Sequence, residues 1–273
     1  MFKIERRDTM TTRAFTLAEL IFHATVRQIR KGHSSGLQAL FMSILQSVIF
    51  IAAFVVMFSV LGLRGNAIRG DFILYIMTGV FLFMTHIKAM GAVVGAEGPA
   101  SPMMKHAPMN TVISITAAAL GSLYVQSLSM FLILFGVHVA WNPIVIENFG
   151  GAAMMFLLAW FVGVAIGMLL LALKPWAPNF VQVVNSIYSR VNMIASGKMF
   201  VANMLPAKML AFFDWNPLFH AIDQSRGYTF INYNPHYTSW QYPLKVGLVL
   251  LVIGLMGEFY TRRHASLSWF AGK

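Results

Sequence analysis

The sequence predicts an all-α membrane protein with six transmembrane helices, an N-terminal amphipathic interface helix and a re-entrant helical hairpin before the last span. Of its 273 residues, 58% are hydrophobic and only 11% are charged, whereas about a quarter of the residues in a soluble domain carry charge. Six stretches come close to or exceed the roughly 20 apolar residues that a helix needs to cross a bilayer. Basic residues gather at the ends of these stretches, which is typical of membrane topology and argues against a nucleic-acid-binding surface.

Residues 14–32 predict an amphipathic helix that lies along the membrane surface. Apolar side chains repeat at helical spacing on one face, and basic residues such as Arg27 and Arg30 fall on the other. Thr16 and Glu19 fit a capping box, which places the start of the helix at Thr16. A helix this short and basic is expected to rest on the membrane; an ordinary solvated helix is the alternative.

The expected spans are residues 37–61, 72–94, 112–139, 152–173, 180–201 and 244–260. The third is long enough to require tilt, and the fifth is the least apolar. The charged start of the chain is followed by no apolar signal core, so the first span is expected to direct the chain to the membrane. With both termini cytoplasmic, thirteen of the twenty Lys and Arg residues lie on the cytoplasmic side, which favours this orientation.

Residues 203–242 predict neither a span nor an ordinary loop. Two proline breaks separate two apolar runs that are both too short to cross a bilayer. Such segments occur at membrane depth only where they are buried in protein or line a wet cavity, so a re-entrant hairpin is expected, with a surface-lying outer loop as the alternative. Asn216 is a good N-cap, with Pro217 at the first helical position. Asp223 and Arg226 stand three residues apart, a spacing at which the two side chains could pair.

Catalysis is not expected in this chain. It contains no cysteine, which excludes disulfides, thiol catalysis and cysteine metal sites. Ser196-Gly197-Lys198 looks like the end of a phosphate loop, but Asn192 and Met199 stand where the motif needs Gly and Ser or Thr. The eight histidines show no metal-binding spacing, and no nucleophile elbow is present.

Two residue patterns are candidates for the lining of a path through the membrane. Three phenylalanines repeat every four residues along the first span; they form either a channel wall or a packing stripe against a neighbouring helix or lipid. A polar edge runs along the fifth span, and polar groups inside a membrane tend to face a bundle interior or a wet pathway. The candidate path residues are Phe50, Phe54, Phe58, Asn185, Tyr188, Asn192 and Ser196.

The loop over residues 95–108 is a candidate partner contact. It is short, punctuated by proline, and carries Met103 and Met104. A solvated connector rarely needs methionine, whereas docking surfaces use this adaptable side chain readily.

The layout resembles the membrane subunit of ABC-type exporters, specifically the permeases of capsular polysaccharide and O-antigen export. The most specific match is the stretch WNPLFHAIDQSRG at residues 215–227. It is similar to the Asn-Pro-Leu-x-His-x-hydrophobic-acidic-x-x-Arg stretch near the C-terminus of capsule-type permeases. The sequence departs from the family in its unbroken third span and in its cytoplasmic tail, residues 261–273, where the stretch SLSWFA at residues 266–271 is less basic than the usual ending of the family.

The resemblance implies a non-catalytic permease in a bacterial inner membrane. It would form a homodimer with two copies of a separate ATPase that binds ATP and Mg²⁺, with no cofactor or metal in this chain. The substrate would be a polysaccharide, with a lipid-linked capsular one expected. Other contacts would be with membrane lipids and with periplasmic or outer-membrane export proteins, and none with nucleic acid.

In this arrangement residues 1–273 form a single permease domain, with residues 37–201 as its first five spans and residues 243–260 as its last. The first and fifth spans would line the path. The outer gate would comprise Trp215, Asn216, Pro217, His220, Asp223 and Arg226. ATPase coupling would use Glu97, Pro99, Met103, Met104, Lys105, His106, Arg27 and Arg30. The alternatives are an ABC-type exporter of a drug or small lipid-like molecule, an ion-coupled secondary transporter, and a membrane-embedded enzyme.

Overall fold

The computed structural model describes residues 10–30, 35–60, 62, 68, 70–98 and 110–264. Within these ranges the regular elements are all helices, which confirms the all-α prediction. Five are long and apolar enough to cross a membrane, so the chain is a multi-pass membrane protein. They are α2 (Gly36–Val60), α3 (Phe72–Val94), α4 (Thr111–Ala140), α5 (Phe149–Leu173) and α9 (Gln241–His264). The expected coupling residues Pro99, Met103, Met104, Lys105 and His106 lie outside the described residues.

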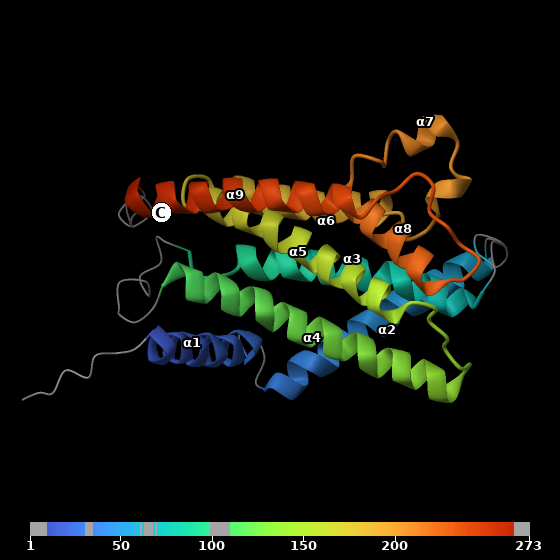
Figure 1. The fold of residues 1–273 in the computed structure, drawn as a ribbon, viewed down its shortest axis with the longest axis horizontal. Helices are drawn as coiled ribbons and strands as arrows, with labels where there is room; N and C mark the ends of the chain where they lie inside the picture. Colours follow the sequence, from blue (N-terminus) through green and yellow to red (C-terminus); the bar gives the residue numbers. More distant parts are fainter. Residues whose placement is uncertain are drawn as a thin grey trace, which may run out of the picture.

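The centre of the bundle is formed by α3 and α5, which pack side by side while α9 covers α5 and α2 and α4 cover α3 (Figure 1). The central and outer helices differ in how much of their most apolar stretch is buried. The buried share is 78% for α3 and 67% for α5, against 17–22% for α2, α4 and α9. Glycines on α5 allow the close central contact. A Cβ on Gly163 would collide with the backbone of His86, and one on Gly167 would lie 2.8 Å from the Met90 carbonyl oxygen.

The fifth predicted span is represented by α6 (Pro178–Ala195), which is 18 residues long and does not belong to the five apolar span candidates. It lies along α5 and α3. Its outer face is largely uncovered, since Phe180, Ile187 and Ile194 are each more than half exposed. The prediction of six apolar spans therefore becomes five apolar helices and a shorter, more polar sixth.

The N-terminal helix α1 (Met10–Arg30) packs against α4, where Gly121 of α4 leaves room for Ile29 of α1. The capping-box prediction was wrong, because the helix begins at Met10. Thr16 lies inside it, and its hydroxyl donates to the Thr12 carbonyl at 3.0 Å. Helix α1, the end of α3, the start of α4 and the end of α9 lie at one end of the bundle (Figure 1), called the α1 end below.

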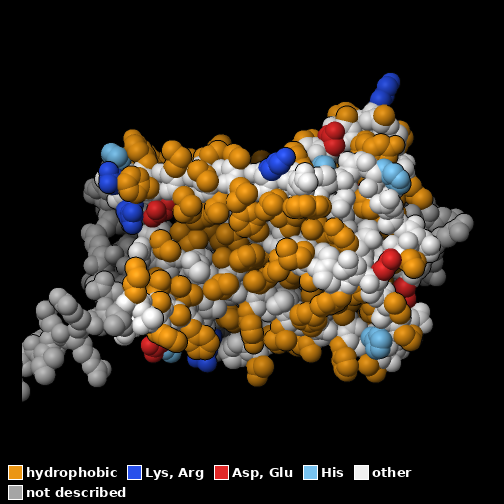
Figure 2. All heavy atoms as spheres, viewed as in Figure 1, with side chains coloured by type: hydrophobic (Ala, Val, Ile, Leu, Met, Phe, Trp, Pro, Cys, Tyr) orange, Lys and Arg blue, Asp and Glu red, His pale blue; other side chains and the backbone are white. Residues whose placement is uncertain are grey.

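Three short elements lie toward the opposite end of the bundle, called the α8 end: the 3₁₀ helix η2 (Ala202–Met204), α7 (Ala207–Leu210) and α8 (Pro217–Thr229). None is long enough to cross a bilayer. Helix α8 packs against α5 and α3. Figure 2 shows that most coloured charged groups lie toward the two ends of the visible face, with one basic group near the middle of its upper edge. A broad apolar area lies between the ends, as expected for a surface surrounded by lipid.

Candidate functional site

Helix α8 starts at a cap that also joins it to α6. The Asn216 side-chain oxygen accepts from the Leu218 backbone N–H at 3.0 Å, which confirms the predicted N-cap. Its amide nitrogen donates to Asn192 Oδ1 and to the Ala195 carbonyl, both at 2.9 Å. Because Asn216 is 99% buried, this one side chain both begins α8 and fixes the end of α6 against it.

Arg226 holds the turn over residues 197–200 that follows α6. Its guanidinium donates to the carbonyls of Gly197 at 2.8 Å, Lys198 at 2.7 Å and Phe200 at 2.6 Å. The side chain is fully buried, and its guanidinium carbon lies 4.3 Å from the centroid of the Tyr75 ring on α3. The planar guanidinium suits this task, because it presents several donors in a rigid fork.

Asp223 does not pair with Arg226, although the spacing of the two residues allowed it: within the described residues no ion pair within 4.0 Å joins the two. Asp223 instead accepts from the Ala202 backbone N–H at 3.2 Å, from the Thr238 hydroxyl at 2.8 Å and from the Tyr233 hydroxyl. These partners hold η2 and the segment before α9 against α8. Arg226 therefore binds the turn over residues 197–200, whereas Asp223 binds η2 and the segment before α9.

His220 continues the same pattern. Its Nε2 lies 2.7 Å from the Asp214 carbonyl, and the Ser239 backbone N–H donates to its Nδ1 at 3.1 Å. Trp215 differs from the other predicted gate residues, because it is 54% exposed. The remaining five gate residues, Asn216, Pro217, His220, Asp223 and Arg226, are buried. Their polar side chains bind the protein's own loops at the α8 end. Their role as a gate stays a prediction.

The 197–200 turn directs Lys198 into a cage of three phenylalanine rings. Nζ lies 3.4 Å from the ring centroid of Phe83, 5.1 Å from Phe54 and 5.5 Å from Phe50. Lys198 is 97% buried, and its Nζ has no hydrogen-bond partner within the described part of the chain. Buried lysines are normally paired. The Lys198 cage, defined by Phe50, Phe54 and Phe83, therefore combines a cation and apolar ring faces without a counter-ion.

The two sets of predicted path residues contact α3 at neighbouring positions, Phe83 and His86, which stand three residues apart and share one face of the helix. Three phenylalanines of α2 pack in the same core cluster as residues of α3: Phe50, Phe54 and Phe58. The Phe50 ring contacts Phe83 of α3, with 6.2 Å between the ring centroids. On the α6 side, the Tyr188 hydroxyl lies 2.9 Å from His86 Nε2. The other His86 ring nitrogen lies 2.9 Å from the Ala159 carbonyl, so His86 links α3, α5 and α6.

The rest of the predicted polar edge on α6 also faces inward. Asn192 and Ser196 are buried, and the Asn192 amide donates to the Tyr188 carbonyl at 3.0 Å while its oxygen accepts from Asn216. Asn185 Oδ1 and Ser196 Oγ are buried without a hydrogen-bond partner among the described residues. The two sets of path residues approach each other through Lys198, which extends from the end of α6 to the rings of α2.

Three of the expected ATPase-coupling residues come together at the α1 end. Arg27 and Arg30 of α1 and Glu97 after α3 line one cavity of about 360 Å³. The Glu97 backbone N–H is held by the Ser114 hydroxyl of α4 at 3.0 Å. Residues about 70 positions apart in the chain thus share one charged surface beside α4.

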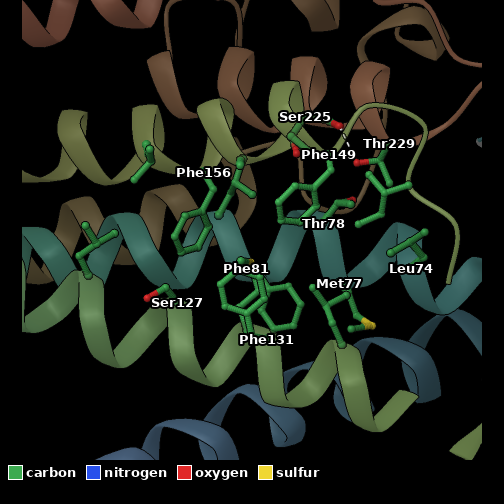
Figure 3. Close-up of a pocket in the computed structure, with 18 residues that line it drawn as sticks. Leu74, Met77, Thr78, Phe81, Ser127, Phe131, Phe149, Phe156, Ser225 and Thr229 are labelled. Carbon is green, nitrogen blue, oxygen red and sulfur yellow. Dashed lines mark hydrogen bonds between the residues drawn. The ribbon is translucent and has the colours of Figure 1, made fainter. Parts of the chain in front are cut away.

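A separate, apolar cavity of about 270 Å³ lies between α3, α4, α5 and α8. Figure 3 shows Phe81, Phe131 and Phe156 around it, with Ser225 and Thr229 of α8 at one side. Three of its hydroxyls offer little to a polar ligand, because those of Thr78, Ser127 and Thr229 donate to carbonyls of their own helices at 2.8 Å, 3.2 Å and 2.8 Å. The lining therefore suits an apolar group.

Sequence reasoning missed the roles of Lys198, Phe83 and His86, whose partners lie on other helices. One signal is present in the sequence: Lys198 is a lysine next to a glycine at the end of an apolar segment. Neither the models of known protein families nor the curated proteins compared with the chain gave a match.

Proposed function

We propose that this chain is the membrane subunit of an ATP-driven exporter, and that two copies form the path for a polysaccharide through a bacterial inner membrane. ATP would be bound and hydrolysed by a separate subunit. The observation that carries the proposal is the shared cavity of Arg27, Arg30 and Glu97. It supports a docking surface formed jointly by the surface helix and the loop after α3, as the resemblance to ABC-type permeases implies.

The α1 end would be cytoplasmic. Arg262 and Arg263 stand at the end of α9, and Arg27 and Arg30 stand at the end of α1. Figure 1 places helix α1 and the end of α9 in the same half of the bundle. An excess of basic residues on one side marks the cytoplasmic face of membrane proteins, so both termini would be inside.

The α8 end would close the outer exit as a re-entrant hairpin. The buried hydrogen bonds of Asn216, His220, Asp223 and Arg226 meet the condition for non-helical backbone at membrane depth, which is that its polar groups are satisfied inside the protein. Rings in the wall of the path suit a sugar chain, which can stack on aromatic faces without a deep binding well.

Two copies would be needed to enclose the path. Helix α6 contacts the bundle on one side only, and its other side exposes apolar residues together with Ser186 and Arg190. A helix face that mixes polar and apolar groups is poorly suited to lipid alone. A second copy facing α6 would shelter these groups around a central path.

The test is purification of the full chain from its native membrane in mild detergent, followed by native mass spectrometry. The proposal expects a mass of two copies of the chain and two copies of an ATP-binding protein. The double variant Arg27→Glu, Arg30→Glu should lose the ATPase but keep the pair of chains, while Lys208→Glu at the α8 end should keep both. A chain that purifies without an ATP-binding protein and transports alone would overturn the proposal.

The apolar cavity favours a second candidate, export of a small lipid-like molecule. It is lined at Ala153 of α5, whereas the adjacent Met154 is 61% exposed on the outside of the bundle. If this candidate is correct, Ala153→Trp should abolish ATP-dependent export of a fluorescent lipid while Met154→Trp leaves it intact. Equal export by both variants would remove the candidate.

A further inference from the structure

We infer that the path takes a sugar polymer that carries negative charges, and that Lys198 is the cation that pairs with them. This inference rests on the proposed function and narrows its substrate to polymers with carboxylate or phosphate groups. It begins from the charges on α2, α3, α6 and the turn over residues 197–200. The described charged residues there are Lys88, Arg190 and Lys198, and none of these segments contains Asp or Glu.

The structure holds Lys198 in place from three directions. Its backbone packs directly on α3 at Gly79, where a Cβ would lie 2.9 Å from the Lys198 Cα. Gly197 before it adopts a left-handed conformation with φ of +74° and lies against Phe219, whose ring leaves no room for a side chain. The Arg226 guanidinium donates to the Lys198 carbonyl at 2.7 Å. These contacts fix the main chain at Lys198, and its stem extends into the cage instead of carrying the ammonium to water, as lysine stems normally do.

When no substrate is bound, the Lys198 ammonium lies among the three phenylalanine rings of the cage. Ring faces attract a cation, yet they do not replace the hydrogen bonds that an ammonium makes with water or with an anion. Helix α2, which supplies Phe50 and Phe54, buries only 22% of its apolar window. Movement of this peripheral helix would expose Lys198 beside rings on which sugars can stack. A carboxylate or phosphate on the polymer would then supply the missing acceptor.

The same charge bias is present near the α1 end of α3. Lys88 lines a groove of about 410 Å³ between α1, α2, α3 and α4. The other polar side chains of this groove are neutral: Gln28, Ser43, Gln46, Ser122 and Gln126. Lys88 stands six residues before the end of α3 at Val94, about 9 Å along the helix axis. The Lys198 backbone contacts Gly79, which lies seven residues after the start of α3 at Phe72. Gly79 and Lys88 are nine residues apart, so they lie on opposite faces of α3, and Lys88 marks a second basic groove that is separate from the Lys198 cage.

The experiment compares a charged and an uncharged polymer on the full chain in nanodiscs of uncharged phosphatidylcholine. The probes are hyaluronan oligosaccharides, which carry a carboxylate on every second sugar, and dextran of matched length. We expect hyaluronan to bind about tenfold more tightly than dextran, since a charge-assisted hydrogen bond is worth that much, and to weaken as salt is added.

Lys198→Met should remove this preference, because the unbranched apolar side chain can still fill the cage of rings. Lys198→Arg should retain part of it, and Lys245→Met, at an exposed position of α9, should leave it unchanged. An unchanged unfolding temperature in Lys198→Met separates lost binding from lost folding.

Equal binding of dextran and hyaluronan would overturn the inference while leaving the proposed function standing, because a neutral polymer would then be an adequate substrate. An unchanged preference in Lys198→Met would remove Lys198 from the role. Failure of both polymers to bind would also overturn the inference. The proposed function is judged separately, by copurification of the ATPase.

Discussion

Arg226→Ala gives the sharpest test of how the α8 end is held together. The substitution removes the donors of three carbonyls, at Gly197, Lys198 and Phe200, and leaves a cavity beside Tyr75. A buried acceptor left without a donor costs about 1–3 kcal/mol. Relaxation of the turn recovers part of the sum, and single substitutions rarely exceed about 4–5 kcal/mol, so we expect a loss of about 4 kcal/mol.

The assay is thermal unfolding of the purified chain in detergent. A loss of this size corresponds to a decrease of about 8–16 °C in Tm for a chain of this length. Arg226→Lys should recover only part of it, because an ammonium cannot reproduce the guanidinium fork. Lys208→Ala, which removes an exposed cation of α7, is the control and should change Tm by less than about 2 °C. A similarly small change in Arg226→Ala would refute the assigned role of its three hydrogen bonds.

The remaining predictions concern the contacts that position the same turn. Asn216→Ala removes the cap of α8 and both donors to the end of α6, so it should lower the free energy of unfolding by about 2 kcal/mol; an unchanged Tm would contradict this. Gly79→Ala should destabilise the chain, because its Cβ would meet the Lys198 backbone at 2.9 Å. Gly91→Ala on the same helix is the control, since its Cβ meets nothing within 4 Å, and helix propensity predicts a gain of about 1 kcal/mol. Equal effects of the two glycine substitutions would argue against close packing of Lys198 on Gly79.

The spans were predictable from the sequence because hydropathy and length are local properties. Helix α3 occupies the predicted residues 72–94 without change. The start of α1 was not predictable from its capping pattern. Thr16 and Glu19 fit the pattern, but the residues before them contain no helix breaker, and the helix continues back to Met10.

The site was predictable only in part, because its decisive contacts join residues far apart in the chain. Spacing alone suggested that Asp223 could pair with Arg226. In the fold, the main chain that follows α6 offers carbonyls to Arg226 and an N–H to Asp223, and these buried groups need partners of their own. Likewise, Lys198 meets Phe83, 115 residues earlier in the chain, only because the turn after α6 packs on α3.

ATP-driven transport of a sugar polymer in inverted membrane vesicles tests the central claim most directly. Vesicles that contain the chain and its copurifying ATPase would be given labelled hyaluronan outside, on the face that was cytoplasmic. The account predicts accumulation inside the vesicles that requires ATP hydrolysis and persists when the proton and sodium gradients are collapsed. Accumulation without ATP, driven by an ion gradient, would contradict it and would favour an ion-coupled transporter.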